Sequence, residues 1–436
     1  MIETIKNAWR IPELRKKIIF TLVCLLIFRL GSAIPVPFIS PEVSKLFSEQ
    51  LAGTALGFLN AMSGGSLEMA NVFALSIQPY INASIIMQLL SVAIPALERM
   101  VKDGGEEGKK KLASITRYAT IAIALLQGYA YYTLLSNGAG SGQSFINVPA
   151  GVPSFFVAVV IVATFVAGAT FIMWLGEQIT ENGIGNGISL ILFVGIVSRA
   201  FPALWRLFQN INAIKWYGFI GVIALFLAVI AFIIFFDGAE RRLSIQYAKR
   251  VVGRKMYGGR STHLPIKVNM SGVMPIIFAS TIATFPATIA AFFNPASDGV
   301  WAKLNRLFFS PTESWIYPIV YLLLIVGFSY FYTAIQYNPV EIANNLKNNG
   351  GFLPGFRPGR PTADFIKKVI SKITLFGAFF LGVIAVLPIL VGHMSSALNG
   401  LSIGGTSVII VVGVALETVK QLESQMMMRN YKGFLE

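Results

Sequence analysis

The side chains that could support nucleophilic, acid–base or metal chemistry are few and widely spaced in this sequence. His263, His393 and Cys24 stand far apart along the chain. A structural or catalytic zinc site needs three or four such ligands together, and nucleophilic catalysis needs a nucleophile beside a general base. No triad, carboxylate pair or nucleotide-binding sequence can be assembled from the residues present. Catalysis is therefore disfavoured, and no metal or cofactor is expected.

One glycine-rich stretch superficially resembles a phosphate-binding loop. It reads GEQITENGIGNGISL at 176–190, with Gly183, Gly185 and Gly187 in alternation. A nucleotide-binding loop would need a preceding strand and a following Lys-Ser or Lys-Thr pair, and neither is present. Close helix contact or a flexible joint is the better interpretation.

The composition indicates a membrane protein. The 436 residues are 55% apolar and only 13% charged, with a mean hydropathy of +0.68, whereas soluble domains carry about a quarter charged residues. Crossing a bilayer takes roughly 20 mainly apolar residues in a helix. Runs such as FLAVIAFIIFF at 226–236 are apolar on every side, unlike the alternating strands of a membrane barrel. The sequence predicts an all-α polytopic protein whose ten spans lie at about 18–38, 75–97, 115–136, 153–175, 184–201, 216–236, 271–293, 316–337, 373–392 and 405–420.

Charged groups inside the predicted spans lie near their ends. Arg29 falls at an outer end, where snorkelling explains it, and Glu177 and Glu417 fall near the opposite ends. Ion-coupled transporters instead carry ionisable groups at membrane depth. The remaining polar groups are neutral, and they suit either a path for substrates of varied charge or ordinary helix-to-helix hydrogen bonding. They are Gln78, Asn82, Gln88, Gln127 and Asn269.

Basic residues are distributed unequally between alternate connections. With Lys372 included, 28 Lys and Arg side chains fall on the side of the two termini and of connections 95–117, 237–270 and 338–368, against six on the other side. The positive-inside rule places the larger group in the cytoplasm, together with both termini. The net charge of +15 is thus concentrated on one face, where topology and anionic lipids account for most of it and ribosomal RNA is a further candidate partner.

The predicted spans divide into two sets of five. We expect a cytoplasmic N-terminus at 1–17, a first half at 18–205, an external connection at 206–215, a second half at 216–420 and a cytoplasmic tail at 421–436. An odd number of spans per set reverses the direction in which the second half enters the membrane. Two such halves can form an inverted pair with a site at their junction.

Three stretches interrupt the hydropathy pattern. The segment from about Asn60 to Asn71 is too short to cross, so it is either a surface hairpin or a fold back into the membrane, which needs protein or water around it. The connection 237–270 alternates polar and apolar residues and predicts a β-hairpin. The stretch Asn344–Phe365 is too polar for lipid and too rich in glycine and proline for a regular helix. Loops of this length are usually functional or disordered.

Six motifs, taken in order, closely resemble the SecY/Sec61-alpha family of protein-conducting channels. They are IFRLGSAIPVP at 27–37, SIQPYINASIIMQLL at 76–90, MWLGEQITENGIGNGISL at 173–190, YAKRVVGRKMYGGRSTHLPIKVNMSGVMPIIFA at 247–279, NPVEIANNLKNNGGFLPGFRPGRPT at 338–362 and GGTSVIIVVGVALE at 404–417. The likeness runs from about residue 15 to the C-terminus. It implies a pore-forming subunit that passes unfolded secretory polypeptides across the plasma membrane and releases transmembrane segments sideways into lipid.

The resemblance also implies an architecture. Two inverted five-helix halves would surround a central pore, sealed by a short re-entrant plug helix, with a lateral gate between the second and seventh spans. The pore ring would be Ile77, Ile81, Leu192, Ile277 and Ile410. The plug would include Asn60, Met62, Ser63, Gly64, Gly65, Leu67 and Met69. Asn82 and Gln127 are the candidate polar contacts of the lateral gate.

The same resemblance implies a set of partners but no small-molecule substrate. These partners are the small membrane subunits SecE and SecG, the SecA ATPase motor, the ribosome, secretory preproteins with their signal peptides, and anionic lipids. The expected docking residues for the motor or ribosome are Arg241, Arg242, Lys249, Arg250, Arg254, Lys255, Lys347, Arg357 and Arg360. A secondary transporter and a scaffold or insertase without a pore remain the alternative classes.

Overall fold

The computed structural model describes most of the chain. The described residues are 2–40, 57, 60, 62–137, 144–149, 151–209, 216–247, 250–252, 255–257, 261–293, 299, 303–304, 307–308, 314–394 and 404–432. Two predicted docking residues, Lys249 and Arg254, lie outside this set, and Arg250 and Lys255 are described by their backbone alone.

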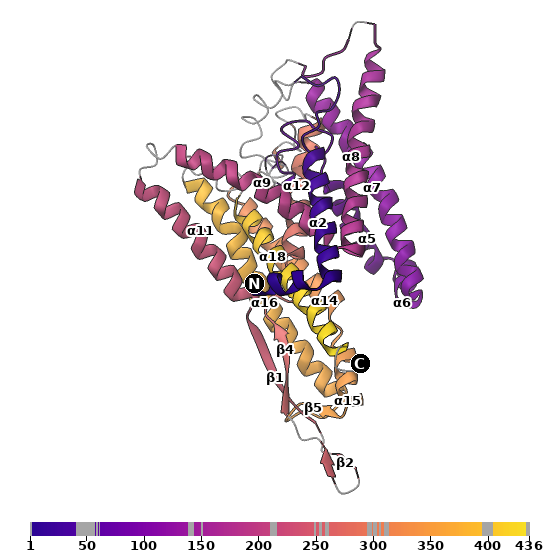
Figure 1. Ribbon diagram of the computed structural model, residues 1–436, viewed down its shortest axis with the longest axis vertical. Coiled ribbons are helices and arrows are strands. Elements are labelled where there is room, and N and C mark those ends of the chain that lie inside the picture. The colour runs from indigo at the N-terminus through magenta and orange to yellow at the C-terminus, as the bar shows by residue number, and fades with distance from the viewer. Residues whose placement is uncertain are drawn as a thin grey trace.

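The molecule is built from two groups of helices that follow one another along the chain (Figure 1). The first group contains α1 (Ile2–Arg10), α2 (Pro12–Gly31), α5 (Gln78–Ala93), α6 (Pro95–Asp103), α7 (Gly105–Ser136), α8 (Ser154–Asn182) and α9 (Gly187–Gln209). The second group contains α11 (Trp216–Asp237), α12 (Met274–Phe293), α14 (Tyr317–Gln336), α15 (Pro339–Asn348), α16 (Arg360–Met394) and α18 (Gly404–Lys432). Each segment predicted to span the membrane overlaps one of these helices.

Length and apolar character together identify fewer certain spans than the sequence predicts. Among the described residues, three helical stretches meet both criteria, at 154–182, 317–348 and 360–387. A fourth is formed if α5 and α6, which are bent by 102° at their junction, count as one broken span. Ile94 has extended backbone there, as the residue before a proline favours. The chain is a multi-pass membrane protein, and ten crossings remain a prediction.

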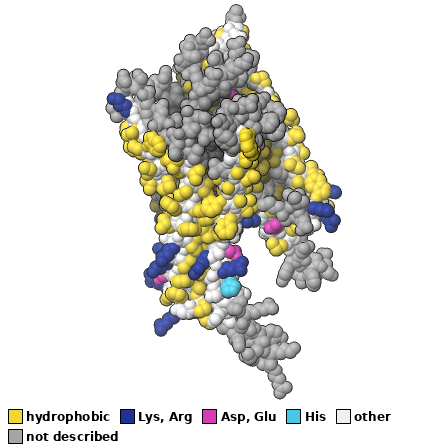
Figure 2. All heavy atoms as spheres, turned by 90° about the vertical axis from the view of Figure 1, so that its left-hand side faces the viewer, with side chains coloured by type: hydrophobic (Ala, Val, Ile, Leu, Met, Phe, Trp, Pro, Cys, Tyr) yellow, Lys and Arg dark blue, Asp and Glu magenta, His cyan; other side chains and the backbone are white. Residues whose placement is uncertain are grey.

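Apolar side chains cover the outer surface of the helical region. On α2, for example, Leu22, Leu26 and Leu30 are exposed, and on α11 Phe232 and Phe235 are exposed. Figure 2 shows a broad apolar band with most of the visible Lys and Arg side chains gathered below it. An exposed apolar surface of this extent is expected where lipid covers the protein.

Two small sheets extend from one end of the molecule, as Figure 1 shows. Strand β1 (Glu240–Tyr247) pairs antiparallel with β4 (Ser261–Lys267), and β2 (Arg250–Val252) pairs with β3 (Lys255–Tyr257). The predicted β-hairpin in the connection 237–270 is confirmed. On its other edge β1 pairs with β5 (Gly351–Phe352), so the sheet order is β4-β1-β5.

The prediction that 344–365 contains no regular helix is wrong at both ends. Helix α15 occupies Pro339–Asn348 and α16 begins at Arg360. Asn338 caps α15, because its side chain accepts hydrogen bonds from the amides of Val340 and Glu341 at 3.2 and 3.5 Å, and Pro339 follows at the position that favours helix initiation. Only the Gly- and Pro-rich residues from Asn349 to Gly359 separate the two helices.

Candidate functional site

Five aliphatic side chains from both helical groups meet in one buried cluster, which we call the waist. Its members are Ile77 at the N-cap of α5, Ile81 in α5, Leu192 in α9, Ile277 in α12 and Ile410 in α18. Each has at most 4% of its surface exposed. The structure therefore brings together all five residues that the family resemblance predicts as a ring.

The waist is enclosed by further apolar side chains. Phe28, Phe73, Val273 and Phe278 belong to the same core cluster. On α8, Gly176 lies beside the waist, because a Cβ atom at that position would be in ordinary van der Waals contact with Cδ1 of Ile77 at 3.5 Å. Alkyl groups in such a cluster exclude water and offer no hydrogen bonds to a passing polar group.

The candidate plug packs into the same apolar core as the waist. Met62 is 2% exposed and belongs to the waist's core cluster. Gly64 lies against α9, where an added Cβ atom would come within 3.1 Å of the backbone of Gly195. Leu67 enters a second apolar cluster that includes Tyr131, and the Tyr131 hydroxyl donates a hydrogen bond to the Leu67 carbonyl.

The described part of the plug is a series of turns and not the regular helix that the resemblance implies. Asn60 and Met62 are helical, but residues 63–70 form consecutive turns. Gly64 and Gly65 have φ angles of 72° and 89°, in the left-handed region that L-residues rarely adopt, and this ends the helix. The amide of Leu67 donates to Ser63 Oγ at 3.4 Å, which supports the turn that follows.

A polar cluster fixes the same segment to α9. Glu68 Oε2 accepts from Arg199 Nη2 at 2.7 Å and from Asn60 Nδ2 at 2.9 Å. The Glu68 amide donates in turn to Asn60 Oδ1 at 3.0 Å. One residue earlier on α9, Ser198 Oγ accepts from Arg29 Nη1 at 3.4 Å. Sequence reasoning missed Glu68 and Arg199, because their separation by 131 positions gives no signal in one chain.

A seam between the two helical groups runs beside the waist. Helix α12 packs against both α5 and α7, and Phe278 of α12 lies 5.3 Å from Tyr332 of α14 between ring centroids. The Gln88 side chain of α5 lies near the Tyr332 hydroxyl across this seam. The two predicted gate residues, Asn82 and Gln127, are buried in α5 and α7, but no hydrogen bond joins them within the described part of the chain.

The two long connections join into a single platform. Because β5 pairs with β1, the segment bearing Arg357 lies beside the hairpin bearing Arg241 and Arg242. Arg241, Lys347, Arg357 and Arg360 are exposed. Arg242 is 68% exposed and pairs with Glu240 at 2.7 Å. Sequence reasoning treated these connections separately, because a two-residue strand such as β5 is too short to recognise.

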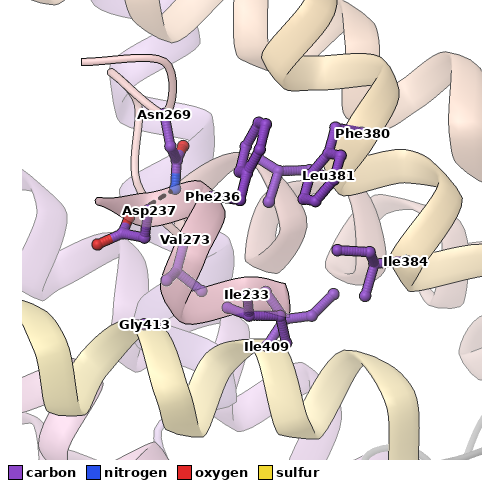
Figure 3. A pocket seen from close by; sticks show the side chains of 10 residues that line it. All are labelled: Ile233, Phe236, Asp237, Asn269, Val273, Phe380, Leu381, Ile384, Ile409 and Gly413. Atoms are coloured by element: carbon purple, nitrogen blue, oxygen red, sulfur yellow. Dashed lines mark hydrogen bonds between the residues drawn. The ribbon is translucent and has the colours of Figure 1, made fainter. Parts of the chain in front are cut away.

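A small apolar hollow lies where α11, α16 and α18 meet the start of α12 (Figure 3). At its polar end, Asn269 Nδ2 donates to Asp237 Oδ1 at 3.1 Å, and Lys420 Nζ lies 2.7 Å from Asp237 Oδ2. The hollow is about the size of one water molecule. It therefore offers no room for an organic substrate or a cofactor.

Comparisons with known proteins place this geometry in context. A family model described as SecY matches residues 71–419. The protein translocase subunit SecY of Streptomyces coelicolor is 43% identical over 439 residues, covering 100% of both chains. Two solved structures share the fold, each covering 97% of both chains. One is a SecY protein whose plug domain is described as stabilising the closed state of the translocation channel, with TM-score 0.66 and 17% identity. The other is Sec61 in the canine ribosome-channel complex, with TM-score 0.63 and 17% identity.

Proposed function

Because this chain belongs to the SecY family of protein translocase subunits, we propose that the waist is the constriction through which it passes polypeptides. The chain is a channel subunit and not a catalytic enzyme. The observation that carries the proposal is the convergence of Ile77, Ile81, Leu192, Ile277 and Ile410, from both helical groups, in one buried cluster that also holds Met62.

An aliphatic constriction suits a channel whose cargo varies in sequence. Branched alkyl side chains bind no particular residue tightly, and they yield by changing rotamers. A protein-sized hole would leak ions, and a narrow apolar neck resists ions because water leaves it. The unfolded chain fills the waist while it passes, and the side chains close the waist behind it.

The plug adds a second seal above the constriction. Met62 fills space beside the waist, and methionine packs adaptably because its side chain is flexible. Displacing the segment 60–71 would expose the waist to an entering chain. The seam of α12 against α5 and α7 would open sideways for hydrophobic segments, with Asn82 and Gln127 as its polar contacts.

The platform is the proposed docking surface for soluble partners. We place it in the cytoplasm with both termini, because of the basic residues gathered there and the positive-inside rule. Arg357 is suited to an acidic or backbone partner, since its planar fork makes paired hydrogen bonds. The partners proposed for the platform are the SecA motor and the ribosome. Elsewhere the chain would bind the small membrane subunits SecE and SecG, signal-bearing preproteins and anionic lipids. The ribosome is supported by the canine ribosome-channel complex.

A conductance measurement tests this function. We expect deletion of residues 60–71 to raise ion leak through the reconstituted, idle protein, because the seal above the waist is lost. A small-solute transporter or a scaffold without a pore would show no leak after the same deletion. A folded deletion variant whose ion leak is unchanged would therefore overturn the proposal.

A further inference from the structure

The plug is attached to the first helical group by an ion pair as well as by apolar contacts. Glu68 and Arg199 meet at 2.7 Å, and their side chains are 13% and 32% exposed. Glu68 lies between Leu67, which is buried, and Met69, which is 63% exposed. The pair therefore lies at the edge of the buried plug, where movement of the plug would separate the two charges.

The hydrogen bonds around Glu68 orient its carboxylate toward α9. Asn60 contacts Glu68 twice, through its side-chain nitrogen at 2.9 Å and through the oxygen that accepts the Glu68 amide at 3.0 Å. This exchange joins both ends of the turn 60–68 into one unit. Arg199 thus holds the whole turn, because a pull on Glu68 is transmitted to Asn60 and to the neighbouring Met62.

The exposure of the two groups makes the contact reversible. A fully buried pair would be costly to separate, because each charge would be left without a partner in an apolar environment. Arg199 is already about one-third exposed, so water can solvate it once the plug moves. Charge-assisted hydrogen bonds are stronger than neutral ones, and the contact is lost over a short displacement. These are the properties of a contact that sets a threshold for opening.

We propose that Glu68 and Arg199 are positioning residues for the plug, and that their ion pair sets how readily an incoming polypeptide displaces it. This inference rests on the proposed channel function. It means that the plug is held in place by this ion pair in addition to its apolar packing.

The test is the idle open probability of the full chain, reconstituted with the membrane subunits that copurify with it. Glu68→Gln and Arg199→Gln each keep the side-chain shape and remove one charge. We expect each to raise the open probability roughly tenfold, equivalent to losing one charge-assisted hydrogen bond. The double variant should leak no more than either single variant, because both remove the same contact.

Charge exchange separates an electrostatic role from a structural one. Glu68→Arg combined with Arg199→Glu should return the open probability to within about threefold of the original. Raising the salt concentration should also increase opening of the unmodified protein but not of Glu68→Gln. Glu107→Gln is the matched control, because Glu107 is 79% exposed and pairs with Lys111 within α7. It should behave like the unmodified protein.

Two results would overturn the inference. One is an unchanged open probability in both single variants, and the other is an exchanged pair that leaks as much as they do. Deletion of residues 60–71 separates a failure of the proposed channel function from a failure of the proposed ion-pair role. If the deletion variant also shows no increase in ion leak, the proposed channel function is wrong. If the deletion variant leaks but both single variants keep the original open probability, only the ion-pair role is wrong.

Discussion

The substitution Leu192→Asn gives a quantitative test of the waist. Leu192 is 1% exposed, and opening a wet passage would bring its side chain into contact with water. Keeping a leucine side chain out of water contributes about 2 kcal/mol. With asparagine at this position that stabilisation of the dry waist is lost, and the wet waist is favoured by about 1 kcal/mol more because water can hydrogen-bond to the amide. The free-energy difference between the dry and the wet waist should therefore shift by about 3 kcal/mol toward the wet state, which corresponds to roughly a hundredfold change in their ratio.

Single-channel recording of the idle, reconstituted protein measures this shift. The fraction of time spent conducting should rise roughly a hundredfold in Leu192→Asn and about 30-fold in Leu192→Ala, which loses about 2 kcal/mol of apolar burial. Leu192→Ile keeps the volume and should change little. The matched control is Ile191→Asn, which alters a fully buried neighbour on α9 that belongs to the same apolar core but is not one of the five waist residues.

The control separates wetting of the waist from general damage. Ile191→Asn should lower thermal stability without a comparable rise in conductance. If Leu192→Asn folds and stays silent, or if Ile191→Asn conducts equally, the waist is not the barrier to ions.

Other predictions concern the platform, the seam and the polar cluster beside the hollow. Arg357→Glu should stop SecA-driven export into vesicles while the membrane fold stays intact; normal export would remove Arg357 from the docking surface. Binding of that partner should weaken clearly as salt rises, and salt-insensitive binding would argue against the basic residues as its attraction. A short thiol crosslink between Gln88→Cys and Tyr332→Cys, made in a Cys24→Ser background, should block sideways release of a hydrophobic segment. Lys420→Met should lower the melting temperature by only about 1 °C, since its pair with Asp237 is 41% and 18% exposed and contributes at most about 1 kcal/mol in a chain of 436 residues; a fall of many degrees would mean the pair contributes far more.

The helices and the waist were accessible from the sequence for different reasons. Hydropathy alone located the helices, because long apolar runs have few other structural solutions. It could not identify the waist, since each of these residues alone looks like ordinary helix packing. Only the match to the family singled them out together: Ile77 and Ile81 lie in the motif 76–90, Leu192 lies two residues after the motif 173–190, Ile277 lies in 247–279 and Ile410 lies in 404–417.

Three features of the structure were not predicted from the sequence, and each has a local or a long-range cause. Helix α15 was missed although its signal is present: Asn338 and Pro339 begin a helix with Glu341 in its first turn, and the neighbouring glycines and prolines outweighed that signal. In the described part of the plug, Asn60 and Met62 are helical as expected, but residues 63–70 form turns because Gly64 and Gly65 adopt left-handed backbone. The Glu68–Arg199 contact depends on how the plug folds back onto α9, and one sequence carries no trace of that tertiary contact.

The most direct test of the constriction is crosslinking to a chain in transit. A secretory polypeptide stalled part-way should crosslink to cysteines introduced by Ile81→Cys and Ile277→Cys, which lie on opposite helical groups. It should not crosslink to Leu323→Cys on α14, where the native side chain is 63% exposed on the apolar outer surface. Absence of crosslinks at both waist positions, with the stalled chain present, would contradict the account.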